Sequence, residues 1–329
     1  MKYKIGIIGG SGYIGSSLSR YLINLYKIKI IDLKKPPDDL NDNVDYSYCD
    51  IRNLEEIKEN LKDVDFVIHT AIIQIPLIND QKKLGYEVNV IGTQNVCRAV
   101  DENQNIKGMI LTGTWHTIGE REISGTIDEE FGFRPDKVED RARLYALSKM
   151  MQESILRFYD EMSDKIYGII RLGTVLGKGM PETTAANLFI DHGLKGESIT
   201  PYKHSIYRPM LYVDISDVCI AFKTYIKKIL DNKITINRNS LSHIVNIYYP
   251  KPITILELAQ YIRDSIVEMT NGRVRPEIEI VDKGMPLLFT ENDIKNIKIN
   301  IDKVKSFLEI DQLTNPKDSI KAIIRSKIL

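Results

Sequence analysis

The chain has 329 residues with 45 basic and 45 acidic side chains, so its formal net charge is zero. A hydrophobic content of 43% and a charged content of 27% are typical of a soluble globular protein and exclude a disordered chain. Zero net charge gives no long-range attraction to a polyanion, so no nucleic-acid partner is expected. No run of about 20 uncharged apolar residues occurs, which predicts no membrane-spanning helix and a cytoplasmic location. The three scattered cysteines predict neither disulfides nor a metal site.

Short apolar runs alternate with amphipathic segments through the first half of the chain. Four runs rich in β-branched residues, 3–8, 27–33, 64–70 and 106–112, predict strands that are covered on both faces. The segments between them have apolar residues three and four positions apart, as amphipathic helices do; they are 11–25, 54–61 and 84–102. Strands alternating with helices predict a doubly wound parallel α/β sheet of the Rossmann type.

The second half begins with a polar stretch, 120–143, whose glycines, proline and charge runs predict a long excursion over the surface. Further helices and strands are then predicted at 140–162, 165–172, 184–195, 210–213, 215–230, 243–247 and 254–268. We expect a dinucleotide-binding domain at 1–173, to which later segments return, and a smaller mixed α/β substrate-binding lobe made mainly of 174–329.

A glycine-rich segment follows the first predicted strand and opens the first helix. Glycines at positions 9, 12 and 15 allow a tight turn, close approach of backbone N–H groups to a pyrophosphate, and close helix packing. Asp32 ends the second predicted strand, where a carboxylate accepts hydrogen bonds from both ribose hydroxyls. That carboxylate would repel a 2′-phosphate, so the pattern predicts NAD as the cofactor. Lys34 and Lys35 follow closely and leave NADP as a minor alternative.

Tyr145 and Lys149 are four residues apart and therefore lie on one face of the helix predicted at 140–162. A free phenol has a pKa of about 10, and a nearby ammonium lowers this pKa toward the range of a base at neutral pH. By itself the pair is also typical of a solvated helix face.

Taken with the glycine-rich loop, these residues resemble the extended short-chain dehydrogenases/reductases, specifically the NAD-dependent epimerase/dehydratase family that includes UDP-glucose 4-epimerase. The resemblance runs from the N-terminus to about residue 268. Other segments that match the family's motifs are Cys49-Asp50-Ile51, His69-Thr70-Ala71, Asn89-Val90-Ile91-Gly92-Thr93, the segment from Thr112 to Gly119, the segment from Arg171 to Gly177, and the segment from Arg208 to Asp214.

The resemblance implies a role for each matched residue. Tyr145 would be the general base, Lys149 would hold the nicotinamide ribose and lower the tyrosine pKa, and Thr114 would hydrogen-bond the reacting oxygen. Substrate contacts are implied for His116, Thr174, Asn187 and Arg208. Cofactor contacts are implied for Gly9, Gly12, Tyr13, Ile14, Gly15, Asp32, Asp50, Ile51, Thr70, Ala71, Asn89, Thr112, Tyr145 and Lys149.

Departures from the family pattern narrow the expected chemistry. The family's dehydratases carry an Asp-Glu pair where this chain has Trp115 and His116, which disfavours dehydration. Asn187 and Arg208 resemble residues that hold a substrate diphosphate, whereas a family asparagine is replaced by Thr174 and a later R-x-G-D motif is absent. We therefore expect a nucleotide-sugar epimerase, with an NAD-dependent dehydrogenase of a small hydroxy or carbonyl compound, such as a uronate or a hydroxy amino acid, as the alternative. A non-catalytic NAD-sensing module is the third hypothesis.

The family's counterparts of the helices at 84–102 and 140–162 pair across a two-fold axis, so the resemblance also implies a homodimer. The apolar positions available for such an interface are Val88, Ile91, Val96, Leu144, Leu147, Met151, Ile155 and Phe158.

Overall fold

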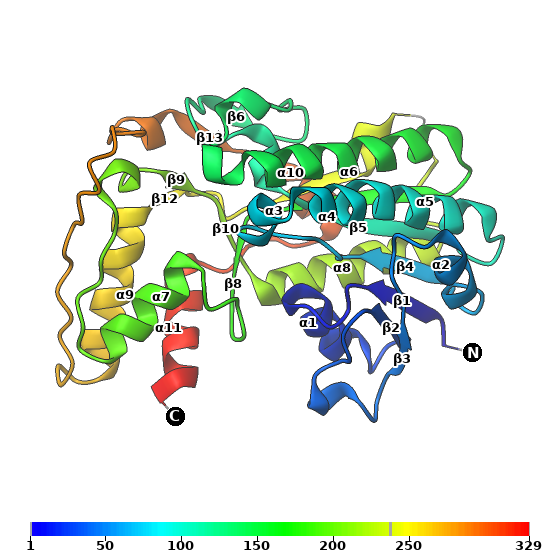
Figure 1. The fold of residues 1–329 in the computed structure, drawn as a ribbon, viewed down its shortest axis with the longest axis horizontal. Helices are drawn as coiled ribbons and strands as arrows, with labels where there is room; N and C mark the ends of the chain where they lie inside the picture. Colours follow the sequence, from blue (N-terminus) through cyan, green and yellow to red (C-terminus); the bar gives the residue numbers. More distant parts are fainter. Residues whose placement is uncertain (1, 237–238, 329) are drawn as a thin grey trace.

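The computed structural model describes residues 2–236 and 239–328, and its largest element is a seven-stranded sheet (Figure 1). Every neighbouring pair in this sheet is parallel, and the strand order is β11-β7-β5-β4-β1-β2-β3. The strands are β1 (Lys4–Ile8), β2 (Lys27–Asp32), β3 (Asp45–Tyr48), β4 (Phe66–His69), β5 (Gly108–Thr114), β7 (Ile166–Leu172) and β11 (Ile244–Ile247). The arrangement confirms the predicted doubly wound α/β fold.

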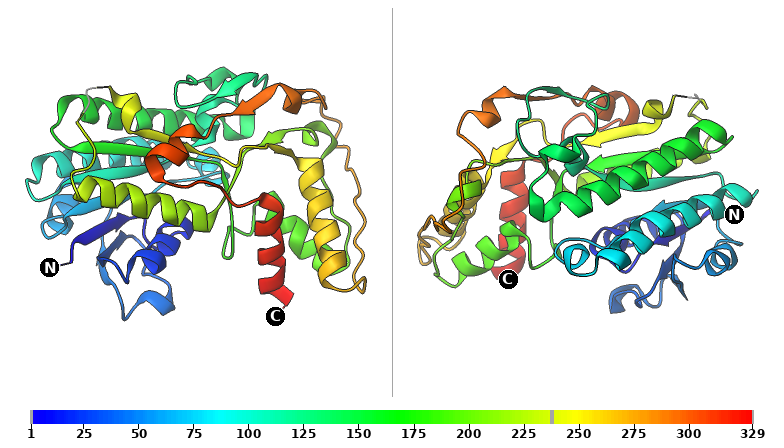
Figure 2. Two further views of the ribbon diagram at one scale, coloured as in Figure 1. Left: turned by 180° about the vertical axis from the view of Figure 1, so that it is seen from behind. Right: turned by 45° about the horizontal axis from the view of Figure 1, so that its top comes forward.

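Helices cover both faces of the sheet, as Figures 1 and 2 show. Ile7 packs into the cluster that contains α1 and α8, whereas the adjacent Ile8 packs into the cluster on the opposite face. Successive strand side chains point to opposite faces, so a continuous apolar run is buried only when both faces are covered. One face holds α2 (Leu54–Asn60), α5 (Thr93–Glu102) and α6 (Arg143–Met162), and the other holds α1 (Tyr13–Leu22), α8 (Ile215–Leu230) and α10 (Asp302–Leu308).

A smaller lobe lies beyond the carboxyl ends of the strands and has its own apolar core. Its helices pack on one another, and Thr254 begins α9 with a capping box that includes Glu257. The helices are α7 (Ala185–Leu194), α9 (Ile255–Met269) and α11 (Pro316–Ile328); the short strands are β8 (Thr174–Leu176), β9 (Pro209–Met210), β10 (Tyr212–Asp214) and β12 (Ile253–Thr254). Helix α8 packs on a face of the large sheet and β11 is a strand of it, so the chain crosses between the lobes more than once.

The helix predicted at 84–102 is divided in the structure. It consists of α4 (Lys82–Tyr86), a π-helical turn (Glu87–Gly92) and α5, and is preceded by the short α3 (Leu77–Asp80). Within the turn, Asn89 accepts a hydrogen bond from the backbone N–H of Ile73 and donates one to its carbonyl oxygen. The Asn89 side chain thus pairs with the backbone N–H and carbonyl groups of Ile73, which follows β4 and lies outside any strand.

The prediction that 120–143 runs over the surface is wrong for part of the segment. Glu120 is 1% exposed and Glu139 is 6% exposed, and Val138 is fully buried. The segment also contributes β6 (Gly125–Ile127), which pairs with β13 (Ile297–Ile299), and ends in short 3₁₀ turns that delay the start of α6 to Arg143. Charge alone did not predict this burial, because the partners of the two carboxylates, Arg141 within the segment and Arg208 far beyond it in the sequence, are identified only by the folded structure.

None of the helices in the described parts of the chain is long and apolar enough to cross a membrane. The three cysteines are buried and unbonded.

Candidate active site

A cavity of about 950 Å³ lies between the two lobes, at the carboxyl ends of the central strands. This is where ligands bind in open α/β sheets. The structure brings ten of the predicted site residues together around the cavity: Tyr13, Ile14, Thr70, Thr112, Thr114, His116, Tyr145, Lys149, Thr174 and Arg208.

The loop between β1 and α1 has a shape that requires glycine at two positions. Gly9 has φ +79°, and a Cβ atom there would lie 2.5 Å from the backbone nitrogen of Ala71. A Cβ atom at Gly15 would lie 2.4 Å from the carbonyl oxygen of Gly9. Without side chains at these positions, the turn is tight and a phosphate group can approach the backbone N–H groups at the start of α1.

Asp32 lies at the end of β2, beside this loop. Its carboxylate accepts hydrogen bonds of 3.0 Å from the backbone N–H groups of Ser11 and Lys34, which hold it in place. Two buried hydroxyls near the cavity, those of Tyr13 and Thr112, have no hydrogen-bond partner among the described residues. These features fit a dinucleotide, with Asp32 at a ribose and the glycine loop at the pyrophosphate.

Asp50 lies apart from the main cavity, in a small pocket with Arg52 and Glu87. The Arg52 side chain donates to both carboxylate oxygens of Asp50, and these hydrogen bonds hold the pKa of Asp50 below its ordinary value. Ile51, next to it, is buried against Gly92.

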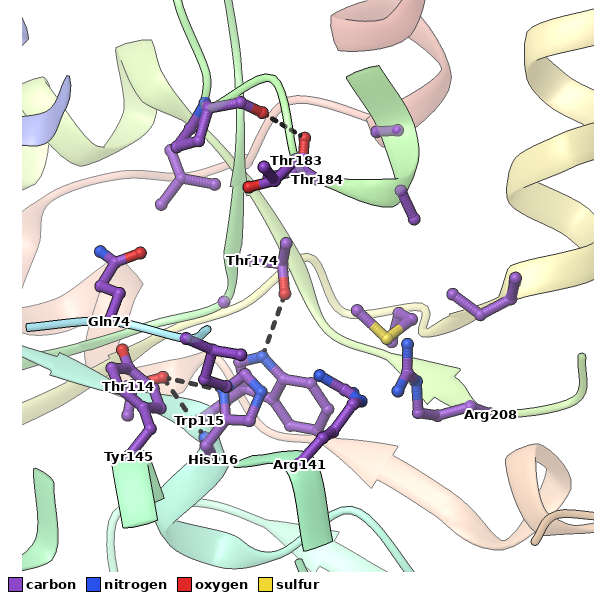
Figure 3. Close-up of a pocket in the computed structure, with 18 of the residues that line it drawn as sticks. Gln74, Thr114, Trp115, His116, Arg141, Tyr145, Thr174, Thr183, Thr184 and Arg208 are labelled. Atoms are coloured by element: carbon purple, nitrogen blue, oxygen red, sulfur yellow. Dashed lines mark hydrogen bonds between the residues drawn. The ribbon is translucent and has the colours of Figure 1, made fainter. Parts of the chain in front are cut away.

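The predicted catalytic residues converge on one corner of the cavity (Figure 3). Thr114 ends β5, whereas Tyr145 and Lys149 lie on successive turns of α6. Burial raises the pKa of Tyr145 to about 12, and a hydrogen bond with Thr114 acts in the opposite direction. Lys149 is 4% exposed, its Nζ donates to the carbonyl oxygen of Thr112 at 2.8 Å, and burial lowers its pKa to about 7. Titratable groups with such displaced pKa values are typical of reactive sites.

His116 packs between two aromatic rings at the same corner. Its ring lies 4.6 Å from that of Trp115 and 5.6 Å from that of Tyr145, measured between centroids. Burial lowers the pKa of His116 to about 4, although the carboxylate of Glu120 acts to raise it. The imidazole is therefore neutral at physiological pH. Trp115 is fully buried and donates from Nε1 to the hydroxyl of Thr174, 3.2 Å away.

Two carboxylates and two guanidinium groups form a cluster beside His116, in which Glu120, Glu139 and Arg208 are buried and the side chain of Arg141 is 45% exposed. Arg141 donates to Glu139 at 2.9 Å and to Glu120 at 3.1 Å, and Arg208 donates to Glu139 at 2.7 Å. Burial alone would raise the pKa of Glu139, but Arg208 and Arg141 outweigh it and hold the pKa below its ordinary value. Glu139 is therefore ionised, and the four charges cancel.

The outer part of the cavity is apolar. Leu188 from α7 and Met285 from the long segment after α9 line it while remaining 44% and 51% exposed, and Tyr202 is 48% exposed. Large apolar side chains held at the mouth of a cavity are typical of a surface that binds the less polar part of a ligand.

Two predicted site residues have their side chains committed to structural contacts away from the cavity lining. The amide oxygen of Asn187 accepts a hydrogen bond from Lys327 of α11 at 2.6 Å, so its neighbour Leu188 faces the cavity instead. Asn89 is fully buried and bonded to the Ile73 backbone and to Ser148. The expected direct contacts of these two residues with ligands are not supported by their positions.

Sequence reasoning missed several lining residues, among them Gln74, Glu139 and Thr183. Glu139 lies in a run of charged residues that has the composition of a solvated loop, and nothing local distinguishes it from its neighbours. Val138 and Ala142 of the same segment are also buried, but two isolated apolar residues in a charged run do not predict this from the sequence.

Residues 5–237 match the family described as "NAD dependent epimerase/dehydratase family". The chain belongs to this family. Its members are NAD-dependent enzymes, so the match confirms the predicted family and NAD as the cofactor.

Curated relatives fall into two groups. A putative UDP-glucose 4-epimerase of Methanocaldococcus jannaschii is 29% identical over 201 residues, which is 58% of this chain and 63% of that protein. The sterol-4-alpha-carboxylate 3-dehydrogenase (decarboxylating) of Bos taurus is 27% identical over 195 residues, 58% of this chain and 51% of that protein. The matched part of this chain thus spans between half and two thirds of the length of these relatives.

Solved structures share the fold over nearly the whole chain. The UDP-glucose 4-epimerase of Thermotoga maritima, determined with UDP-glucose, superposes with a TM-score of 0.75 at 19% identity, covering 99% of this chain and 100% of that one. The dTDP-glucose 4,6-dehydratase of Bacillus anthracis, in complex with NAD, gives a TM-score of 0.77 at 19% identity, covering 99% and 96%.

Proposed function

We propose that this chain is an NAD-dependent epimerase of a nucleotide sugar and that Tyr145 is its general base. The observation that supports this most directly is that Thr114, Tyr145 and Lys149 line one cavity, where Tyr145 is hydrogen-bonded to Thr114 and Lys149 to the Thr112 carbonyl oxygen, and that Tyr13 and Ile14 after the glycine loop line the same cavity. Oxidising a secondary alcohol needs a proton acceptor and a hydride acceptor at the same carbon. Tyr145 is the proton acceptor in this proposal, and the nicotinamide of the cofactor would lie beside it as the hydride acceptor.

Each residue has a distinct role in this proposal. NAD bound beside this corner would supply the hydride acceptor. The Tyr145 oxygen takes the hydroxyl proton, and the Thr114 hydroxyl orients the reacting oxygen. Lys149 can gain or lose a proton near neutral pH, because burial lowers its pKa to about 7. The hydrogen bond with Thr114 opposes the effect of burial on the pKa of Tyr145, and an ammonium brought close to the phenol would act in the same direction.

Epimerisation requires that the oxidised sugar turn over within the site and take the hydride back on its other face. A cavity of about 950 Å³ provides room for such a substrate. Dehydration is disfavoured because Trp115 is buried and bonded to Thr174, and neither Trp115 nor His116 supplies a carboxylate. The UDP-glucose seen with the Thermotoga maritima structure supports a nucleotide sugar as the substrate class.

A net dehydrogenase acting on a less charged alcohol is the second candidate. It is favoured by the apolar mouth of the cavity, by the commitment of Asn187 to Lys327, and by the pairing of Arg208 with Glu139. The sterol dehydrogenase among the curated relatives also supports it.

A product screen separates the two candidates. The purified protein is denatured to identify any released dinucleotide, and the intact protein is incubated with UDP-, GDP- and dTDP-sugars and, in parallel, with NAD and less charged secondary alcohols. We expect an epimerised sugar nucleotide without accumulation of NADH. Stoichiometric NADH with no epimer would refute the epimerase and support the dehydrogenase.

A further inference from the structure

Arg208, which resembles a family residue that holds the substrate's diphosphate, is already paired with an internal carboxylate. Its Nη1 donates to Oε1 of Glu139 across 2.7 Å, and the arginine as a whole is only 9% exposed. The two residues are 69 positions apart in the sequence, and Glu139 reaches the cavity from the segment 120–143. Figure 3 shows the Arg208 and Arg141 side chains extending among the residues that line the cavity.

The guanidinium of Arg208 is not fully satisfied by this pair. Its Nε is buried and has no hydrogen-bond partner among the described residues. An unpaired donor at a charged, desolvated group is costly, and it is satisfied when an oxyanion binds. The Arg208 guanidinium therefore has a donor that Glu139 does not use, which favours an oxyanion that displaces Glu139 and receives more of the guanidinium's hydrogen bonds.

The net charge around Arg208 determines how strongly an anionic ligand is attracted. Glu120 lies 3.9 Å from Arg208, and Arg141 contacts both glutamates, so two positive and two negative groups balance. A diphosphate entering the cavity would therefore face a neutral cluster. Removing the carboxylate nearest to Arg208 would make the cluster cationic.

We propose that Glu139 is an internal competitor of the substrate's anionic group for Arg208, and so sets how tightly the cavity holds a nucleoside diphosphate. This inference rests on the proposed function for the identity of the ligand. Release of Arg208 does not leave Glu139 unpaired, because its other oxygen keeps the 2.9 Å hydrogen bond from Arg141. The exchange thus replaces one ion pair by another inside the same low-dielectric site.

The test measures the affinity of UDP by titration calorimetry for the unmodified protein and for Glu139→Gln. Glutamine keeps the shape and a hydrogen-bond acceptor while removing the charge. We expect Glu139→Gln to bind UDP at least tenfold more tightly, which corresponds to about 1.4 kcal/mol. The gain should shrink as salt is added, because it comes from charge.

Two control variants define the origin of the gain. Asp140→Asn removes one negative charge at the next residue, which also lines the cavity but is highly exposed and pairs with Arg143. We expect it to change the UDP affinity by less than about threefold, because exposed charges are well screened.

In the double variant Glu139→Gln/Arg208→Gln the gain in UDP affinity should be absent. Glu139→Asp, which shortens the reach to Arg208 and keeps the charge beside Arg141, should give a smaller gain and serves if Glu139→Gln does not fold.

The outcomes separate this inference from the proposed function. Equal UDP affinity in the unmodified protein and Glu139→Gln overturns the competition while leaving the nucleotide-sugar proposal intact. Binding by Glu139→Gln alone supports the competition and contradicts a nucleotide-sugar substrate. Absence of binding by both proteins overturns the inference, because a freed Arg208 would then not form an anion site.

Discussion

The hydroxyl oxygen of Thr114 lies 3.2 Å from Nδ1 of His116. Nε2 of the same imidazole lies 3.6 Å from a carboxylate oxygen of the buried Glu120, and we infer from this proximity that the single ring proton of the neutral histidine is on Nε2. Nδ1 is then an acceptor, and Thr114 donates its proton to it. The Thr114 oxygen also accepts a hydrogen bond from the backbone N–H of His116, which leaves it one lone pair for the Tyr145 hydroxyl. His116 thereby orients the hydroxyl that the proposed reaction uses.

Replacing His116 should separate this orienting role from simple packing. The side-chain oxygen of asparagine can occupy the position of Nδ1, so we expect His116→Asn to keep most of the turnover. His116→Leu offers no acceptor, and we expect it to lose at least about tenfold, the scale of one misoriented hydrogen bond in a transition state. Steady-state turnover of the substrate found in the product screen measures both variants. Equal activities would show that His116 acts only by filling space.

Tyr145→Phe should abolish turnover and leave NAD binding nearly unchanged, because it removes only the phenol oxygen that takes the proton. Tyr159→Phe, on the same helix but with its hydroxyl bonded to Gln94, is the matched control and should retain activity. Calorimetry with NAD and turnover on the identified substrate check the two effects separately. Retention of more than a tenth of the activity by Tyr145→Phe would show that another group is the base.

Lys149 should make the stability of the protein depend on pH. Its pKa is about 7 in the folded protein against 10.5 ordinarily, so the unfolded chain holds a proton between these values that the folded chain has lost. The cost of burying Lys149 is therefore complete below pH 7 and disappears as the pH rises toward 10.5.

Lys149→Met removes this cost. We expect its free energy of unfolding, relative to the unmodified protein, to be higher near pH 6.5 than near pH 9.5 by about 2–4 kcal/mol. Loss of the hydrogen bond to the Thr112 carbonyl oxygen lowers both values equally. Denaturant unfolding at the two pH values measures the difference, and the exposed Lys62→Met should show none. A pH-independent difference for Lys149→Met would contradict a lowered pKa.

Asp32 should make the protein prefer NAD to NADP. Its carboxylate is held beside the glycine loop by Ser11 and Lys34, and it would lie against a 2′-phosphate. We expect NAD to bind at least tenfold more tightly, about 1.4 kcal/mol. Calorimetry with both cofactors tests this preference. In Asp32→Ser the ratio of NAD affinity to NADP affinity should be smaller. An equal or reversed preference in the unmodified protein would be incompatible with this placement of the carboxylate.

We propose that the chain forms a homodimer through α5 and α6, which lie side by side on one face (Figure 1). Val88 and Val96 point into the core and are unavailable, whereas Ile91, Met151 and Phe158 are 41%, 42% and 69% exposed. An isologous dimer would cover these side chains with their copies.

Light scattering should give a mass near twice 37.7 kDa at micromolar concentration. We expect Met151→Glu to shift the protein to monomer, because like charges would meet near the axis. Leu25→Glu, at an exposed apolar position outside this face, should remain dimeric. A monomeric unmodified protein would refute the dimer, and a dimeric Met151→Glu would exclude Met151 from the interface.

The sequence by itself determined the features that depend on neighbouring residues. The apolar runs that become β1, β2, β4 and β5, and the glycine segment between the first strand and helix, are local patterns with one structural solution. They were sufficient for the fold class, for NAD as the cofactor and for placing Tyr145 and Lys149 on one helix face, because helix and strand periodicity place such residues without reference to the rest of the chain.

The tertiary structure alone decided which polar side chains face the cavity. Asn187 fits a substrate motif, but Lys327 of the last helix turns its amide toward α11 and leaves Leu188 at the cavity. Glu139 resembles a surface residue until Arg208, 69 positions away, neutralises it in a buried site. The charge state and the direction of a side chain depend on partners that are distant in sequence, and local periodicity contains no information about them.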